Sequence, residues 1–100
     1  MLSLEQALAE LPDTAAGIAL YLHERGIKGI REDDCACPLA NYLIGLGFTE
    51  VKVDRVLIEV YSERHHYYET AVPSDAVRDF IRRFDFHAEW PTLVSEAADA

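Results

Sequence analysis

The chain has 100 residues, half of them hydrophobic, and 18 acidic against nine basic residues give it a formal net charge of −9. A chain of this length buries one sizeable core and not two, so we expect a single domain over residues 1–94. No apolar stretch reaches the ~20 residues that a bilayer span requires. The negative charge repels nucleic-acid phosphates. Composition therefore argues against a membrane span and against direct DNA or RNA binding.

The two ends and the cysteines bear on the compartment. Glu5 and Glu10 lie in a segment that is typical of an amphipathic helix and not of a secretion signal. Cys35 and Cys37 are one residue apart, so a disulfide between them would close only a trivial loop, and we expect reduced thiols. The cytoplasm is the expected location. Residues 95–100 are small or acidic and are predicted to form a flexible acidic tail.

Three helices are predicted before residue 50. Ser3 and Gln6 form a capping-box pattern, and the helix that they begin ends at Pro12. Asp13 or Thr14 can cap a second helix, for which Gly26 would be the left-handed stop. A third helix would begin at Pro38, with Cys37 as its cap, and its apolar stripe is Leu39, Tyr42, Leu43 and Leu46.

The hydrophobic period then changes to two. Runs over residues 51–53, 56–60 and 66–72 predict three strands, with a turn or bulge near Asp54 and Arg55. A reversal around Arg64 would place three pairs on the core side of the sheet, namely Val60 with Tyr68, Ile58 with Thr70 and Val56 with Val72. Tyr61, Tyr67, Leu57 and Ala71 would lie on the other side.

A last helix, capped by Ser74, carries the stripe Val77, Phe80, Ile81 and Phe84. It should pack on the sheet or on the second helix, and residues 90–93 should fold back as a short closing segment. The predicted fold is therefore α+β, with three N-terminal helices, a three-stranded antiparallel β-meander and a C-terminal helix.

The cysteines offer one chemical hypothesis. A cysteine at a helix N-terminus has a stabilised thiolate, but three carboxylates at residues 32–34 oppose this effect. Together with two of the histidines, Cys35 and Cys37 could provide four zinc ligands, although a gap of one residue is shorter than zinc sites use. We expect no cofactor and no metal, and a metal- or thiol-dependent protein remains the alternative.

The polar face of the predicted hairpin offers the main hypothesis. In the register above, Glu59 lies opposite Glu69, beside Tyr61 and Tyr67. Opposed carboxylates can act as an acid and a base, but no further catalytic motif accompanies them, and we expect no enzymatic activity. Tyrosine is enriched at protein contacts. We therefore predict a partner-binding face made of Tyr61, Tyr67, Leu57, Glu59 and Glu69.

Three segments carry a resemblance. The run Cys37–Leu43, followed by residues 72–73 and by Phe80–Asp85, resembles a group of short uncharacterised proteins from actinobacteria and their phages. The likeness covers the middle and C-terminal two-thirds of the chain. Its motifs are mostly cap and core residues, so it implies a shared fold and no catalytic or binding residue. A phage or mobile-element setting would imply binding or inhibition of a host protein.

Together these observations predict a small acidic regulatory or inhibitory module that binds a protein. The partner could be a second copy of the chain. An acidic mimic of nucleic acid is a further alternative, and it predicts that acidic side chains cluster on one face of the protein.

Overall fold

The structure is a computed structural model that describes residues 2–95. Its elements, in chain order, are α1 (Leu4–Ala9), α2 (Ala15–Glu24), α3 (Pro38–Gly45), β1 (Phe48–Val53), β2 (Ile58–Ser62), β3 (Tyr67–Ala71), α4 (Asp75–Phe86) and a short 3-10 helix, η1 (Pro91–Leu93). The strands form one antiparallel sheet of order β1-β2-β3. The predicted α+β fold is confirmed.

The predicted helix caps are also confirmed. Ser3 Oγ accepts the N–H of Gln6 at 3.1 Å, and Gln6 Oε1 accepts the N–H of Ser3 at 2.9 Å. The side chains of Thr14 and Cys37 each accept a backbone N–H in the first turn of α2 and α3. Gly26 follows α2 with φ 68°, a left-handed conformation that costs glycine little. Local sequence therefore determines where these helices begin and end.

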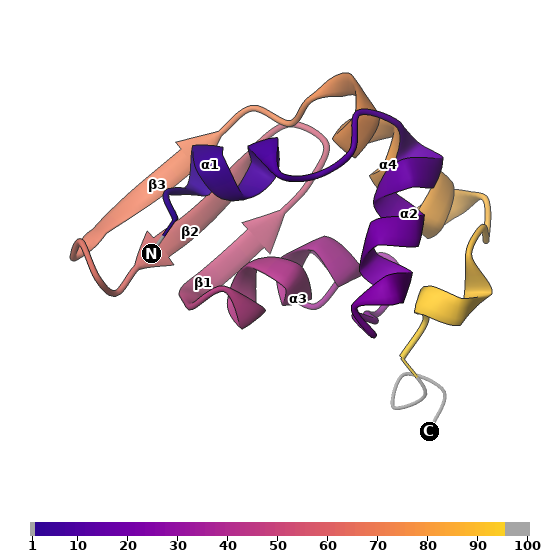
Figure 1. Cartoon of the computed structure of the whole chain (residues 1–100), viewed down its shortest axis with the longest axis horizontal. Helices are drawn as coiled ribbons and strands as arrows, with labels where there is room; N and C mark the ends of the chain where they lie inside the picture. The colour runs from indigo at the N-terminus through magenta and orange to yellow at the C-terminus, as the bar shows by residue number, and fades with distance from the viewer. Residues whose placement is uncertain (1, 96–100) are drawn as a thin grey trace.

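The core lies between the sheet and the helices that pack on it, and between the helices themselves. In Figure 1, α1 lies in front of β2 and β3, α3 runs along β1, and α2 packs beside α4. The largest fully buried side chains are Phe48, Phe80, Phe84, Leu4, Ile18, Leu22, Leu39, Leu43, Ile58, Leu93, Val53 and Val60. Tyr42 connects α3 to α1, because its hydroxyl donates to the carbonyl oxygen of Ala7 at 2.7 Å.

The second hairpin differs from the prediction by one residue. β2 pairs with β3 through Ser62–Tyr67, Tyr61–Tyr68, Val60–Glu69, Glu59–Thr70 and Ile58–Ala71. The chain reverses around Arg64 as predicted, but the loop holds four residues, 63–66, so the predicted strand pairs are wrong by one residue. His66 has φ 58° and donates its N–H to the Ser62 carbonyl at 2.8 Å, which closes this loop.

A shift of one residue exchanges the two faces of a strand. Tyr67, Glu69 and Ala71 therefore lie on the core side of β3, while Tyr68 and Thr70 lie on the opposite side. Val56 is not in a strand at all: it lies in the turn between β1 and β2 and is 79% exposed. The Asp54 carboxylate accepts two backbone N–H groups of that turn, which confirms the turn predicted there.

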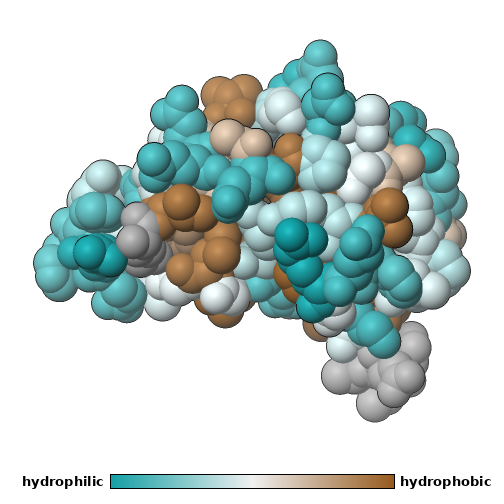
Figure 2. Space-filling model, viewed as in Figure 1, coloured by the Kyte–Doolittle hydropathy of each residue, from teal (hydrophilic) through white to brown (hydrophobic). Residues whose placement is uncertain are grey.

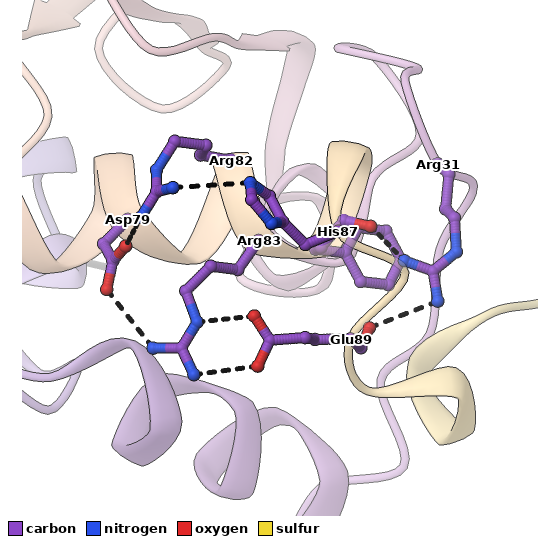
Figure 3. Close-up of polar contacts among 7 residues, drawn as sticks. Arg31, Asp79, Arg82, Arg83, His87 and Glu89 are labelled. Atoms are coloured by element: carbon purple, nitrogen blue, oxygen red, sulfur yellow. Dashed lines mark hydrogen bonds and ion pairs between the residues drawn. The ribbon is translucent and has the colours of Figure 1, made fainter.

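The segment after α4 is held by hydrogen bonds from Arg83 and Arg31 to Glu89, which we call the clamp (Figure 3). The guanidinium of Arg83 donates to both carboxylate oxygens of Glu89, at 2.6 and 2.9 Å, and to Asp79 at 3.3 Å. Arg31 donates to the backbone carbonyls of Phe84 and Glu89. Trp90 stacks on Phe80 with ring centroids 5.1 Å apart, and η1 contacts α2. The predicted closing segment is thus present.

The predicted tail begins at a residue with an ordered contact. Ser95 donates its N–H to the carbonyl oxygen of Gly29 at 2.8 Å. The rest of that predicted tail, residues 96–100, lies outside the described residues.

The surface on the side of α1 is mostly hydrophilic, and Figure 2 shows its hydrophobic patches separated by hydrophilic residues. The large hydrophobic side chains that are exposed in the described part of the chain are Leu20, Ile44, Val56, Leu57, Tyr67, Tyr68, Val72 and Phe86. None of the helices that the structure describes combines the length and the apolar character needed to span a bilayer.

The bond between Tyr42 and Ala7 predicts a stability effect. Ala7 lies in the last turn of α1, where carbonyl oxygens lack partners within the helix. Tyr42→Phe should leave this carbonyl buried and unpaired, at a cost of about 1–3 kcal/mol in the free energy of unfolding. Urea denaturation measures the change. Tyr68→Phe, which removes an exposed hydrogen bond, is the control, and an equal loss in both variants would contradict the assignment.

The clamp predicts a pH-dependent effect. The hydrogen bond from Arg83 lowers the pKa of Glu89 from its ordinary value of 4.5, so this carboxylate stabilises the fold above that value. The contribution is lost as the pH falls through the lowered pKa. Glu89→Gln should therefore unfold at lower urea concentration than the wild type at about pH 7, and the difference should shrink at about pH 3. Glu24→Gln, an exposed change in α2, should show no such loss, and a pH-independent difference for Glu89→Gln would contradict the prediction.

Candidate protein contact surface

The outer face of the sheet is the side opposite the core. It is formed by six side chains in two rows across the strands: Thr49, Tyr61 and Tyr68 in one, and Lys52, Glu59 and Thr70 in the other. All six are partly or largely exposed. The described helices that contact the sheet do so elsewhere, since α1 packs on the core side of β3 and α3 packs along β1. This face is therefore accessible.

Two tyrosines and one glutamate are organised on the outer face. The rings of Tyr61 and Tyr68 are 5.1 Å apart at an interplanar angle of 60°, and Tyr68 donates its hydroxyl to Glu50 Oε1 at 3.0 Å. This hydrogen bond to the Glu50 carboxylate raises the pKa of Tyr68 above its ordinary value. The ring is held in place before any partner arrives.

The position of Glu50 comes from an irregularity in β1. The register of β1 with β2 shifts between Thr49 and Lys52, and Glu50 adopts φ 49° within this interval. A bulge of this kind turns a side chain away from its regular direction. As a result the Glu50 carboxylate, which comes from β1, reaches a hydroxyl on β3, two strands away.

An open hollow of about 650 Å³ adjoins this group. It is lined by Cys35, Ile44, Glu50, Val51, Lys52, Glu59 and Tyr68. Two carboxylates and one ammonium therefore face it, and the Lys52 ammonium lies 4.0 Å from Asp34. The exposed side chain of Ile44, at 46%, adds an apolar wall from α3. The hollow combines net negative charge with apolar surface.

The five residues of the predicted binding face do not all lie on the same side of the sheet. Tyr61 and Glu59 lie on the outer face, and Leu57 precedes them at the end of the β1–β2 turn, 38% exposed. Tyr67 and Glu69 lie on the core side of β3. The prediction that Glu59 lies opposite Glu69 is wrong, because Thr70 lies opposite Glu59 and Val60 lies opposite Glu69. The acid–base pair suggested by that opposition does not form.

Tyr68 takes the place that was predicted for Tyr67. Because the two tyrosines are consecutive, either register places one of them on the outer face, and this signal was present in the sequence. Glu50 carried no such signal, since its orientation depends on the bulge.

Glu69 has a structural partner at the start of α1. Its Oε1 accepts the N–H of Leu4 at 3.1 Å, and its Oε2 is buried without a hydrogen-bond partner among the described residues. The first N–H groups of a helix have no partner within it, so the carboxylate satisfies one of them. This contact ties α1 to β3.

Neither cysteine is placed to react as a thiolate. Burial raises the pKa of Cys37 to about 11, and its Sγ accepts the N–H of Ala40 as the cap of α3. Cys35 is exposed, but a hydrogen bond to Asp34 raises its pKa as well. Both groups are mainly protonated at neutral pH, whereas the nucleophile is the thiolate.

Asp33, Asp34 and Cys35 offer ligand atoms within 4.8 Å of one another, an arrangement that could hold a metal ion. Within residues 2–95, neither Cys37 nor a histidine joins this group, so the four-ligand zinc set considered from the sequence is not assembled. Asp33 already accepts the N–H groups of Cys35 and Ala36, at 3.0 and 3.1 Å. Its carboxylate therefore closes a turn in the loop before α3.

No family model, curated protein or solved structure matches the chain. The resemblance to short actinobacterial and phage proteins stays a prediction. Its two motifs, Cys37–Leu43 and Phe80–Asp85, fall at the start of α3 and within α4, where most of their side chains are buried. Residues of this kind build a fold, and they do not reach the outer face.

The thiol environments predict a simple labelling pattern. Iodoacetamide should modify Cys35 alone in the folded protein, and more slowly at about pH 7 than it modifies free cysteine, because the raised pKa reduces the thiolate fraction. Cys37 should react only after unfolding. Mass spectrometry counts the modified thiols, with Cys35→Ser as a control that should leave the folded protein unlabelled. Rapid labelling of both cysteines would contradict the placement.

Proposed function

We propose that the chain is a non-enzymatic regulatory or inhibitory module that binds a protein partner through the outer face of its sheet. The observation that carries this proposal is the pair Tyr61–Tyr68, held by Glu50 on a face that no described helix covers. Tyrosines at the centre of an interface supply a large share of binding free energy.

Preorganisation supports the choice of this surface. Binding normally costs about 0.5–1.5 kcal/mol for each flexible side chain that becomes fixed. Tyr68 is already oriented by its hydrogen bond and by contact with Tyr61, although it is 55% exposed. A partner that covers these rings would gain apolar contact while losing little side-chain entropy.

The charge of the hollow indicates the chemistry of the partner. Glu50, Glu59 and Lys52 line the hollow, and the Lys52 ammonium lies 4.0 Å from the carboxylate of Asp34. A lysine or arginine of the partner can approach the two carboxylates while an apolar neighbour contacts the tyrosine rings or Ile44. The overall charge of −9 favours the same kind of partner, because it steers basic proteins toward the chain. The partner is therefore expected to present a basic surface.

The test compares two double variants in affinity capture from the native host, followed by titration of each with the purified partner. Tyr61→Ala with Tyr68→Ala should lose the partner, because truncation of central tyrosines weakens binding at least about 30-fold. Tyr61→Ala with Tyr67→Ala should retain more affinity, since Tyr67 is equally exposed, at 52%, but lies off the outer face. Binding should weaken as salt is added.

Two outcomes would contradict the proposal. One is equal loss of affinity in both double variants while circular dichroism shows both folded, which would remove the distinction between the faces. The other is a partner that binds with unchanged affinity when Tyr61 and Tyr68 are both truncated, which would place the contact elsewhere.

A further inference from the structure

The hydrogen bonds around the β1–β2 turn establish which way the backbone of each strand faces. Val53 donates its N–H to the Asp34 carbonyl at 2.7 Å, away from β2, and Asp54 donates to Leu57 at 3.2 Å within the hairpin. Because bonded and non-bonded pairs alternate in an antiparallel ladder, Glu59 directs its backbone groups toward β1. The backbone groups of Ile58, Val60 and Ser62 then face β3.

This alternation leaves backbone groups unpaired along the edge of β3 that faces away from β2. Tyr67, Glu69 and Ala71 pair with the residues of β2 that face them, so their backbone groups are used within the sheet. The N–H and C=O groups of Tyr68 and Thr70 point away from β2, and no described residue hydrogen-bonds to them. In Figure 1, β3 lies at the margin of the sheet.

Such an edge is a template for another strand unless charge, proline or a bulge protects it. Within β3 the only charged side chain is Glu69, and its carboxylate is directed onto the N–H of Leu4. Proline occurs after the strand, at Pro73, and the pairing of β3 with β2 contains no bulge. The exposed edge is therefore uncharged and regular.

We propose that a second copy of this chain pairs with β3 in the antiparallel direction, with a two-fold axis at Thr70. In this register, Thr70 exchanges its backbone hydrogen bonds with Thr70 of the second copy, and Tyr68 exchanges them with Val72. An axis at Glu69 would instead place two carboxylates opposite each other, which destabilises a strand pair.

The side chains that meet in this register match one another. On the outer side, Tyr68 lies opposite Val72 of the second copy, and these two residues are 55% and 74% exposed in the single chain. Aromatic and β-branched side chains form favourable cross-strand pairs. Pairing with a second copy thus covers the exposed apolar residues on the outer side of this edge, Tyr68 and Val72, each with the other.

Charge complementarity at the ends favours a second copy over an unrelated strand. Antiparallel pairing brings the 63–66 loop of one copy beside the start of α4 of the other. Arg64 is exposed there beside the exposed Glu63, and Arg64 forms no ion pair with a described residue. At the start of α4, the side chain of Asp75 is 96% exposed although it contacts Arg78. Arg64 of each copy can therefore approach Asp75 of the other at both ends of the symmetric pair, while Glu63 balances the charge of the loop itself.

The test uses analytical ultracentrifugation of the full chain at physiological ionic strength, over a range of concentrations. The wild type should form a dimer as its concentration rises. Thr70→Lys places two ammonium groups at the axis and should raise the dimer dissociation constant at least tenfold. Thr92→Lys, an exposed change of the same charge on η1, should leave the dimer unchanged. A wild type that stays monomeric throughout, or equal dimerisation of Thr70→Lys, would overturn the proposal.

Amide hydrogen exchange by NMR locates the interface. The N–H groups of Tyr68 and Thr70 should become protected as the dimer forms, because they enter the new ladder. A dimer in which both amides exchange as fast as in the monomer would overturn the proposal. Thr70→Pro should weaken the dimer, since proline has no N–H to donate, and equal dimerisation of this variant and the wild type would also overturn the proposal.

The same variants separate this inference from the proposed function. Tyr61→Ala changes the outer face without altering the edge, so it should weaken partner binding and leave the dimer intact. Thr70→Lys should raise the dissociation constant of the dimer, and because Thr70 also lies on the outer face, dimerisation and not partner binding is the readout for this variant.

Discussion

The pairing of Ser62 with Tyr67 is the constraint on which the exposed surface of this protein depends. Ser62 is fully buried, and its carbonyl and hydroxyl oxygens accept the N–H groups of His66 and His65. These bonds set a four-residue loop, and the loop length sets the register of β3. Because side chains alternate along a strand, this one turn decides that Tyr68, and not Tyr67, stands beside Tyr61.

The same register connects the sheet to the N-terminal helix. With Val60 opposite Glu69, the glutamate lies on the core side, where it reaches the first turn of α1. α1 has only six residues and is too short to be stable in isolation. Its contacts with Glu69 and Tyr42, at opposite ends of the helix, hold it against the sheet and α3. Moving β3 by one residue would remove the first of these contacts.

The two surfaces that we propose are adjacent and chemically different. The outer face presents aromatic rings beside a negatively charged hollow, which suits a basic protein surface. The edge of β3 presents unpaired backbone groups with no outward charge, which suits another strand. Tyr68 belongs to both, through its ring in one case and its backbone in the other. A strand-paired dimer would therefore place two tyrosine pairs on one continuous sheet face.

Much of the architecture was decided by local sequence. The capping residues Ser3, Thr14 and Cys37 and the stripe of α4 predicted the helices, because caps and amphipathic periods involve neighbours within one or two turns. The alternation from Val51 onward likewise predicted three strands. The register of β3 was not predictable in this way. Tyr67, Glu69 and Ala71 form no more apolar a set than Tyr68, Thr70 and Val72, so the pattern allowed either face to be buried. The hydrogen bonds between Ser62 and the loop at residues 63–66 and the contact of Glu69 with α1 decided between them, and the second of these joins residues 65 positions apart. The outer face follows from that decision, whereas the reach of Glu50 across the sheet depends on the bulge in β1.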